Sequence, residues 1–111
     1  MYDREKLPLP EFEQNPDGAP KYAIKERGEI YNFKPIEAGN DGLFDEELKR
    51  TLIHGYYASI SNMDAQVGKV IDELKRLDLD KNTIIVLWGD HGWHLGDHGM
   101  WTKHTNYEQA T

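Results

Sequence analysis

The sequence predicts an α/β fold in which helices cover both faces of a sheet, and two consecutive patterns carry this prediction. Between residues 45 and 78, apolar residues recur every three or four positions, as in a helix with one buried face. A continuous, β-branched-rich apolar run follows at residues 83–88 and is typical of a strand buried on both faces of a parallel sheet. Helix, short turn and buried strand make half of a βαβ unit, so we expect a fragment of a helix-sheet-helix sandwich.

The helical segment has a clear predicted start. Asp45 is a residue type that caps helix N-termini, and the acidic Glu46 and Glu47 suit the positive first turn. Gly55 and Gly68 lie inside the segment, where each glycine costs about 1 kcal/mol relative to alanine. The pattern therefore fits either two consecutive helices or one long bent helix. Its apolar stripe consists of Leu48, Leu52, Tyr56, Ile60, Met63, Val67, Val70, Leu74 and Leu77.

Residues 1–43 are expected to form an irregular arm. This segment contains all five prolines and sustains neither a helical nor a strand period. Such a long stretch without regular structure is unusual inside a self-sufficient domain. The chain is therefore expected either to dock on other material or, as we favour, to be a fragment of a longer protein whose body the arm covers.

Composition and charge exclude several classes of function. The 111 residues suffice for one small domain at most. With 20 acidic and 13 basic residues the net charge is −7, and no basic cluster is present, which argues against a nucleic-acid partner. Neither a membrane-length apolar run nor the layout of a secretory signal is recognised, so no membrane partner is expected. Cysteine is absent, so any metal must bind oxygen and imidazole ligands.

The loop after the predicted strand contains the residues expected to carry chemistry, because ligands of open α/β sheets bind beyond the carboxyl ends of the strands. Four of the five histidines lie between residues 91 and 104, and the unit Gly-Asp-His-Gly occurs at 89–92 and again at 96–99. A carboxylate beside an imidazole supplies ligands for a divalent ion. Asp90 and His91 are therefore predicted to be metal ligands rather than a solvated turn pair.

Other residues of this loop have two interpretations each. Asp97 and His98 are expected to brace the loop or to orient the metal ligands, rather than to bind the ion. His94 is expected near the mouth of the pocket. Lys103 supplies a cation for an anionic oxygen, although a loop lysine is usually solvated. Trp93 and Trp101 suit either the lining of a sugar-binding pocket or the burial of the loop against the body.

With these motifs, the sequence resembles the sulfatases of the alkaline-phosphatase superfamily, and the iduronate-2-sulfatase branch in particular. The resemblance covers residues 44–111, and more loosely 2–10. It implies an alkaline-phosphatase-like sandwich in which residues 1–111 are part of the catalytic domain, with the arm at 1–43 and the helix, strand and metal loop at 44–111. The matching segments are 57–64 (YASISNMD), 82–86 (NTIIV), 90–93 (DHGW), 95–96 (LG) and 98–99 (HG), with Trp101, Lys103 and Asn106.

The resemblance also implies roles for individual residues. In this branch of the family, an aspartate at a strand end and the following histidine bind a calcium ion, which assigns Asp90 and His91 as its ligands. A lysine further along contacts the sulfate group, which assigns Lys103 as a catalytic and substrate-binding residue. Trp101 and His104 beside it are assigned to substrate binding. His104 stands where a tyrosine is familiar, so the substrate pocket is expected to differ.

The family's nucleophile is a formylglycine made from the first residue of a Cys/Ser-x-Pro-Ser-Arg motif, and this motif is absent from the sequence. The two serines, Ser59 and Ser61, are followed by neither Pro-Ser nor Arg. The resemblance thus implies part of a calcium-dependent sulfatase that acts on sulfated sugars such as glycosaminoglycans and is inactive by itself. Its expected partners are this substrate and the remainder of the domain, and its expected location is periplasmic, secreted or lysosomal.

Two alternative functions stay open. A phosphodiesterase or phosphonate hydrolase of the same superfamily uses the same metal-bound Asp-His pair, and its threonine nucleophile would distinguish it from a sulfatase. A non-catalytic module that binds carbohydrate or metal would retain one half of the site. A full-length reading frame immediately upstream would exclude the second alternative.

Overall fold

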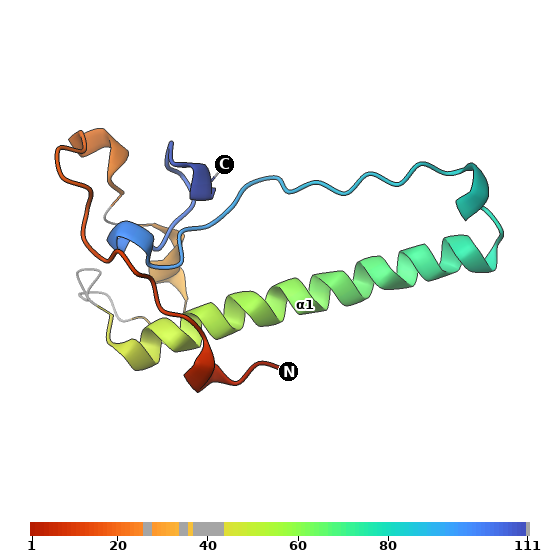
Figure 1. Ribbon diagram of the computed structural model, residues 1–111, viewed down its shortest axis with the longest axis horizontal. Helices are drawn as coiled ribbons and strands as arrows, with labels where there is room; N and C mark the ends of the chain where they lie inside the picture. The colour runs from red at the N-terminus through yellow and green to blue at the C-terminus, as the bar shows by residue number, and fades with distance from the viewer. Residues whose placement is uncertain (26–27, 34–35, 37–43, 111) are drawn as a thin grey trace.

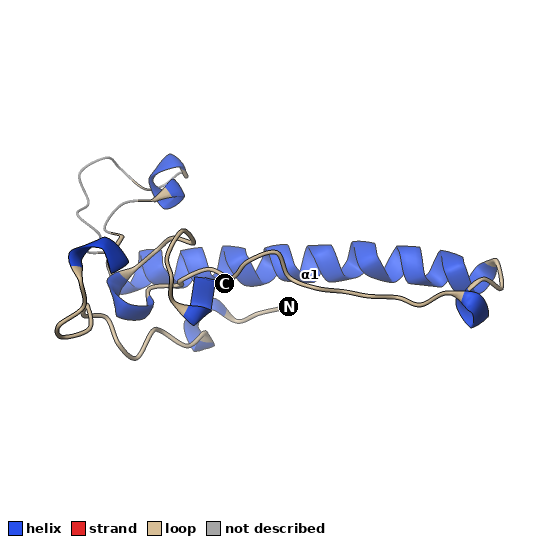
Figure 2. Cartoon of the chain, turned by 90° about the horizontal axis from the view of Figure 1, so that it is seen from above, coloured by secondary structure: helices blue, strands red, loops and turns tan. Residues whose placement is uncertain are grey.

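The computed structural model describes residues 1–25, 28–33, 36 and 44–110. Its dominant element is the helix α1, Glu46–Arg76, which has 31 residues and runs along the long axis of the molecule (Figure 1). No described residue belongs to a β-strand (Figure 2). The described residues also form short 3-10 helices, namely η1 (Arg4–Lys6), η2 (Lys21–Ala23), η3 (Glu29–Asn32), η4 (Asp80–Asn82), η5 (Asp97–Gly99) and η6 (Glu108–Ala110).

Helix α1 passes without a break through both of its glycines, so a single helix forms rather than two. It begins as predicted, because the side chain of Asp45 accepts a hydrogen bond of 2.8 Å from the backbone N–H of Leu48. It ends two residues before the predicted boundary. Asp78 adopts a left-handed conformation with φ 58°, and the N–H of Leu79 donates to the carbonyl of Leu74 at 3.0 Å. This left-handed cap closes the last turn and stops the helix.

The core lies against the N-terminal half of α1, where the arm and the loop after residue 90 meet. The indole of Trp101 packs on the ring of Phe44 with 5.4 Å between centroids. The guanidinium of Arg50 donates to the carbonyls of Glu5 and Leu7, at 3.0 and 2.5 Å, and so ties the arm to the helix. The buried apolar cluster consists of Leu7, Ile30, Ile36, Phe44, Ile53 and Trp101.

In the described part of the arm, regular structure is limited to the 3-10 turns η1, η2 and η3. The portions of the predicted arm at 26–27, 34–35 and 37–43 lie outside the described residues. Among the residues described, no helix combines the length and the apolar composition that a membrane span requires.

The C-terminal half of α1 lacks a comparable core. Its stripe residues Met63 and Val70 are 47% and 64% exposed. The radius of gyration is 17.7 Å. A compact domain of about 100 residues has a radius of gyration of about 13 Å. The described chain is therefore packed at one end of α1 and open at the other.

The strand predicted at residues 83–88 is not formed in this structure. Residues 84–88 are extended and run beside the C-terminal half of α1, with side chains between 51% and 91% exposed (Figure 1). No backbone hydrogen bond joins them to another described segment. A strand needs a neighbour to pair its N–H and C=O groups, and no neighbouring strand lies within the described residues.

We expect the 111-residue chain to self-associate through residues 84–88, because an unpaired apolar segment is a template for pairing with another copy. Val86→Lys places a charge in this segment and should shift the chain toward monomer in sedimentation velocity. Asn82→Lys adds the same charge just outside the segment and should leave association unchanged. Identical sedimentation of the wild type and Val86→Lys would contradict this prediction.

Candidate functional site

The first Gly-Asp-His-Gly unit presents its polar side chains to solvent. The side chain of Asp90 is 93% exposed, and its Oδ2 lies 4.0 Å from Nε2 of His91. Nδ1 of His91 lies 2.9 Å from the carbonyl oxygen of Gly92. A carbonyl only accepts, so Nδ1 carries the hydrogen, and Nε2 of the neutral ring keeps its lone pair. The unit therefore supplies an exposed carboxylate and an imidazole nitrogen that is able to bind a metal ion.

The second unit is engaged with the arm instead. Nδ1 of His98 lies 3.2 Å from the carbonyl oxygen of Gln14, and its ring stacks on Phe12 with 5.8 Å between centroids. Asp97 Oδ2 is buried, has no hydrogen-bond partner and lies 3.9 Å from Nε2 of His98. These contacts hold the loop against the arm, as expected for a bracing unit.

A tight turn at Gly96 brings this second unit over the core. Gly96 has φ +92°, and a Cβ placed there would lie 2.7 Å from the Trp101 ring and 2.9 Å from Pro10. Both the left-handed backbone and the close approach require glycine. The turn thus fixes the loop on the buried indole.

His94 is fully buried, although it lies among the residues that line a pocket beside the arm. Its backbone N–H donates to the carbonyl of Thr102 at 2.9 Å, and its Nε2 lies 2.7 Å from the hydroxyl of Thr105. Nδ1 is buried without a hydrogen-bond partner. Burial lowers the pKa of His94 below its usual 6.5, the carboxylate of Asp97 opposes this shift, and His98 adds to it. A neutral imidazole therefore links the two sides of the loop.

Lys103 is held by contacts that sequence analysis did not anticipate. Its Nζ lies 3.3 Å from Oε2 of Glu29 in the arm and 5.7 Å from the centroid of the Trp93 ring. Its side chain is 23% exposed, so the lysine is not a solvated surface group. Its two neighbours in sequence differ in solvent exposure: Thr102 is buried, whereas His104 is exposed.

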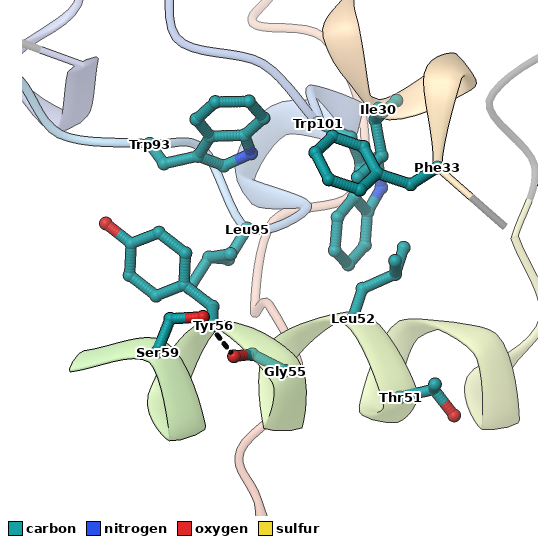
Figure 3. A pocket seen from close by; sticks show the side chains of 10 residues that line it. All are labelled: Ile30, Phe33, Thr51, Leu52, Gly55, Tyr56, Ser59, Trp93, Leu95 and Trp101. Carbon is teal, nitrogen blue, oxygen red and sulfur yellow. Dashed lines mark hydrogen bonds between the residues drawn. The ribbon is translucent and has the colours of Figure 1, made fainter. Parts of the chain in front are cut away.

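A cavity of about 480 Å³ lies between α1 and the loop. Figure 3 shows the rings of Trp93, Trp101 and Tyr56 around it, with Leu52 and Leu95 on its walls. Trp101 thus belongs to the core and also lines a cavity, so the two interpretations of this residue are compatible. The lining is mostly apolar and aromatic, which suits the flat face of a ring-shaped ligand.

The described residues do not assemble a complete metal centre. Among them no group of three or more His, Asp or Glu side chains is arranged to hold an ion. Calcium takes about six to eight ligands, mostly oxygen. Asp90 and His91 supply at most two carboxylate oxygens and one nitrogen. They fit part of a divalent-ion site, which the described residues alone do not complete.

The ion pairs of the described residues do not link Lys103 to Asp90, since Lys103 pairs with Glu29 and Asp90 lies beside His91. Glu29 was missed because it lies in the arm, far along the chain, where no periodic pattern marks it. Thr105 was missed as well. The sequence marks Thr105 only by its position after Lys103 and His104, and a threonine in a loop is too common to indicate a role.

We expect His94 to titrate below pH 6.5 in the folded chain. The unfolded chain binds the proton more readily, so the stability that this site contributes is complete above pH 6.5 and is lost as pH falls through the folded pKa. The Cε1–H signal of His94, identified by its loss in His94→Gln, should show this midpoint by NMR. In guanidinium chloride the midpoint should rise toward 6.5. An equal midpoint in the folded and denatured chains would contradict the burial of this ring.

Comparison with known proteins places this sequence in a family. The sulfatase family model matches residues 8–111. The chain is 36% identical to iduronate 2-sulfatase of Mus musculus and 35% identical to that of Homo sapiens, in each case over 100% of this chain and 21% of the relative. It is 40% identical to choline-sulfatase of Rhizobium meliloti over 57% of this chain and 12% of the relative. The chain thus spans about a fifth of the length of the iduronate 2-sulfatases it matches. It belongs to the sulfatase family, whose fold is of the alkaline-phosphatase-like α/β type.

Proposed function

We propose that this chain is part of the catalytic domain of a calcium-dependent sulfatase that hydrolyses sulfate esters of sulfated sugars. The observation that carries the proposal is the first Gly-Asp-His-Gly unit, where an exposed carboxylate and an imidazole with an available Nε2 lie side by side. Membership in the sulfatase family supplies the reaction class. The match to iduronate 2-sulfatases over the whole chain, at 35% and 36% identity, supports a sugar ester as the substrate.

Cleavage of a sulfate ester needs a nucleophile, a cation that polarises the sulfuryl oxygens, and groups that stabilise the developing charge. Asp90 and His91 would hold the calcium ion, which supplies the polarising charge when bound. Lys103 would place its ammonium against a sulfate oxygen, and its low exposure strengthens that electrostatic interaction. Trp101 and His104 would contact the substrate beside it.

The nucleophile has no candidate among the residues of this chain. The sequence contains no cysteine, and its two serines lie on α1, where the hydroxyl of each is engaged in a hydrogen bond. The hydroxyl of Ser59 donates to the carbonyl of Gly55 at 3.0 Å, and that of Ser61 lies 2.7 Å from the Tyr2 hydroxyl. The nucleophile is therefore expected in another part of the catalytic domain.

The same proposal accounts for the open end of the molecule. In a helix-sheet-helix sandwich, residues 83–88 would be a strand of the sheet, and the C-terminal half of α1 would cover one face of it. The apolar side chains exposed on both segments are the ones that such packing would bury. Asp90 and His91 would then lie at the carboxyl end of that strand, where ligands of α/β sheets bind.

We expect the purified 111-residue chain not to hydrolyse an aryl sulfate above background, with or without calcium, because it lacks the nucleophile. The measurement is release of the phenol during prolonged incubation, with Asp90→Ala as the control for contaminating activity. Turnover that persists through purification and disappears in Asp90→Ala would overturn the proposal that the chain is only part of a catalytic domain.

In the complete catalytic domain, Asp90→Ala and His91→Ala should each weaken calcium affinity more than about tenfold, and activity should partly return at high calcium. Lys103→Ala should leave calcium affinity nearly unchanged and lower kcat/KM about a hundredfold, roughly 2–3 kcal/mol of transition-state stabilisation. Isothermal calorimetry and steady-state kinetics measure the two quantities.

Asp97→Ala is the matched control for these substitutions, because it removes a carboxylate from the second, arm-bound Gly-Asp-His-Gly unit. It should leave calcium affinity within a few-fold of the wild type. Normal calcium binding by Asp90→Ala, together with a large loss in Asp97→Ala, would show that the second unit binds the ion.

A further inference from the structure

The arm segment at residues 28–30 lies directly against the segment at 101–103, and each of its residues makes a separate contact. Ile30 and Trp101 belong to the same buried cluster. A Cβ on Gly28 would lie 2.7 Å from Cβ of Thr102, so the side chain of Thr102 packs against the backbone of residue 28 only because this residue is glycine. Between these two anchored residues, the carboxylate of Glu29 reaches Lys103 at 3.3 Å.

This arrangement restrains a side chain that is otherwise flexible. A lysine ammonium is a point charge on a four-carbon stem with several rotatable bonds, so its direction depends on its partners. Here the carboxylate of Glu29 binds it, and the face of Trp93 lies 5.7 Å away, within the range of a cation–π interaction. An ammonium has three N–H donors, so donors stay available for a further oxygen ligand.

We propose that Glu29 is a positioning residue for Lys103, an inference that rests on the proposed contact between Lys103 and the sulfate group. Glu29 lies on η3, whose docking on Thr102 and Trp101 sets the place of its carboxylate. The carboxylate fixes the ammonium in one direction and also places a negative charge beside the sulfate site. Glu29 therefore favours the oriented ammonium that the transition state needs and weakens the binding of the anion in the ground state.

Removing the charge of Glu29 should therefore lower turnover but tighten the binding of the anion. A residue with a purely structural role would not change these two quantities in opposite directions. In the complete catalytic domain, Glu29→Gln should lower kcat for an aryl sulfate about tenfold, because the ammonium loses its orientation. The same substitution should tighten competitive inhibition by inorganic sulfate about threefold, because one repelling charge is gone. Damage to the fold would not strengthen anion binding. Glu29→Asp keeps the charge and should lie nearer to the wild type in both measurements.

Two further variants complete the test. Glu11→Gln removes an exposed carboxylate from the same arm and should change neither kcat nor sulfate inhibition. In a Lys103→Ala background, Glu29→Gln should have no additional effect, because Glu29 acts through this lysine. An equal loss of kcat in both backgrounds, or weaker sulfate inhibition in Glu29→Gln, would overturn the inference alone. Full activity of Lys103→Ala would overturn both the inference and the proposed role of the lysine.

Discussion

The packing of Trp101 determines the arrangement of the rest of the described structure. The indole lies against Phe44 just before α1, beneath the left-handed turn at Gly96, and beside Ile30 of the arm. Three segments that are distant in sequence thus meet on one aromatic side chain. Burying a large apolar side chain stabilises a fold by about 2–3 kcal/mol, so one such residue contributes much in a core this small.

Because the loop is fixed at this point, two pairs of its polar residues face opposite ways. The inward group follows the turn, where His98 contacts the arm and Lys103 is paired with Glu29. Asp90 and His91 precede the turn and face solvent. The outward group is suited to complete a site with residues from elsewhere, whereas the inward group holds the loop and arm together. The two Gly-Asp-His-Gly units are alike in sequence but differ in which side of the turn they occupy.

Local patterns predicted the local elements well. The Asp45 cap and the apolar stripe determine α1, because both act within a few residues along the chain. Features that depend on distant partners could not be predicted in this way. Residues 83–88 have the composition of a strand, but pairing requires a neighbour that the described residues lack. His94 is buried by contacts with Thr102 and Thr105, and Glu29 reaches Lys103 from the arm. No periodic pattern in the sequence marks either contact. The roles of Asp90 and His91, predicted from the loop motif and from resemblance, and that of Lys103 stay predictions.

The contact between Glu29 and Lys103 spans most of the chain, with the whole of α1 between its two residues. Helical turns form between residues that are close in sequence. Closing a long loop instead costs conformational entropy, and only the contacts made after closure compensate for this cost. We therefore expect the environment of the lysine to assemble late in folding, after the helix is in place. During synthesis, Glu29 leaves the ribosome before residue 103, so it cannot complete this contact until residue 103 has also emerged.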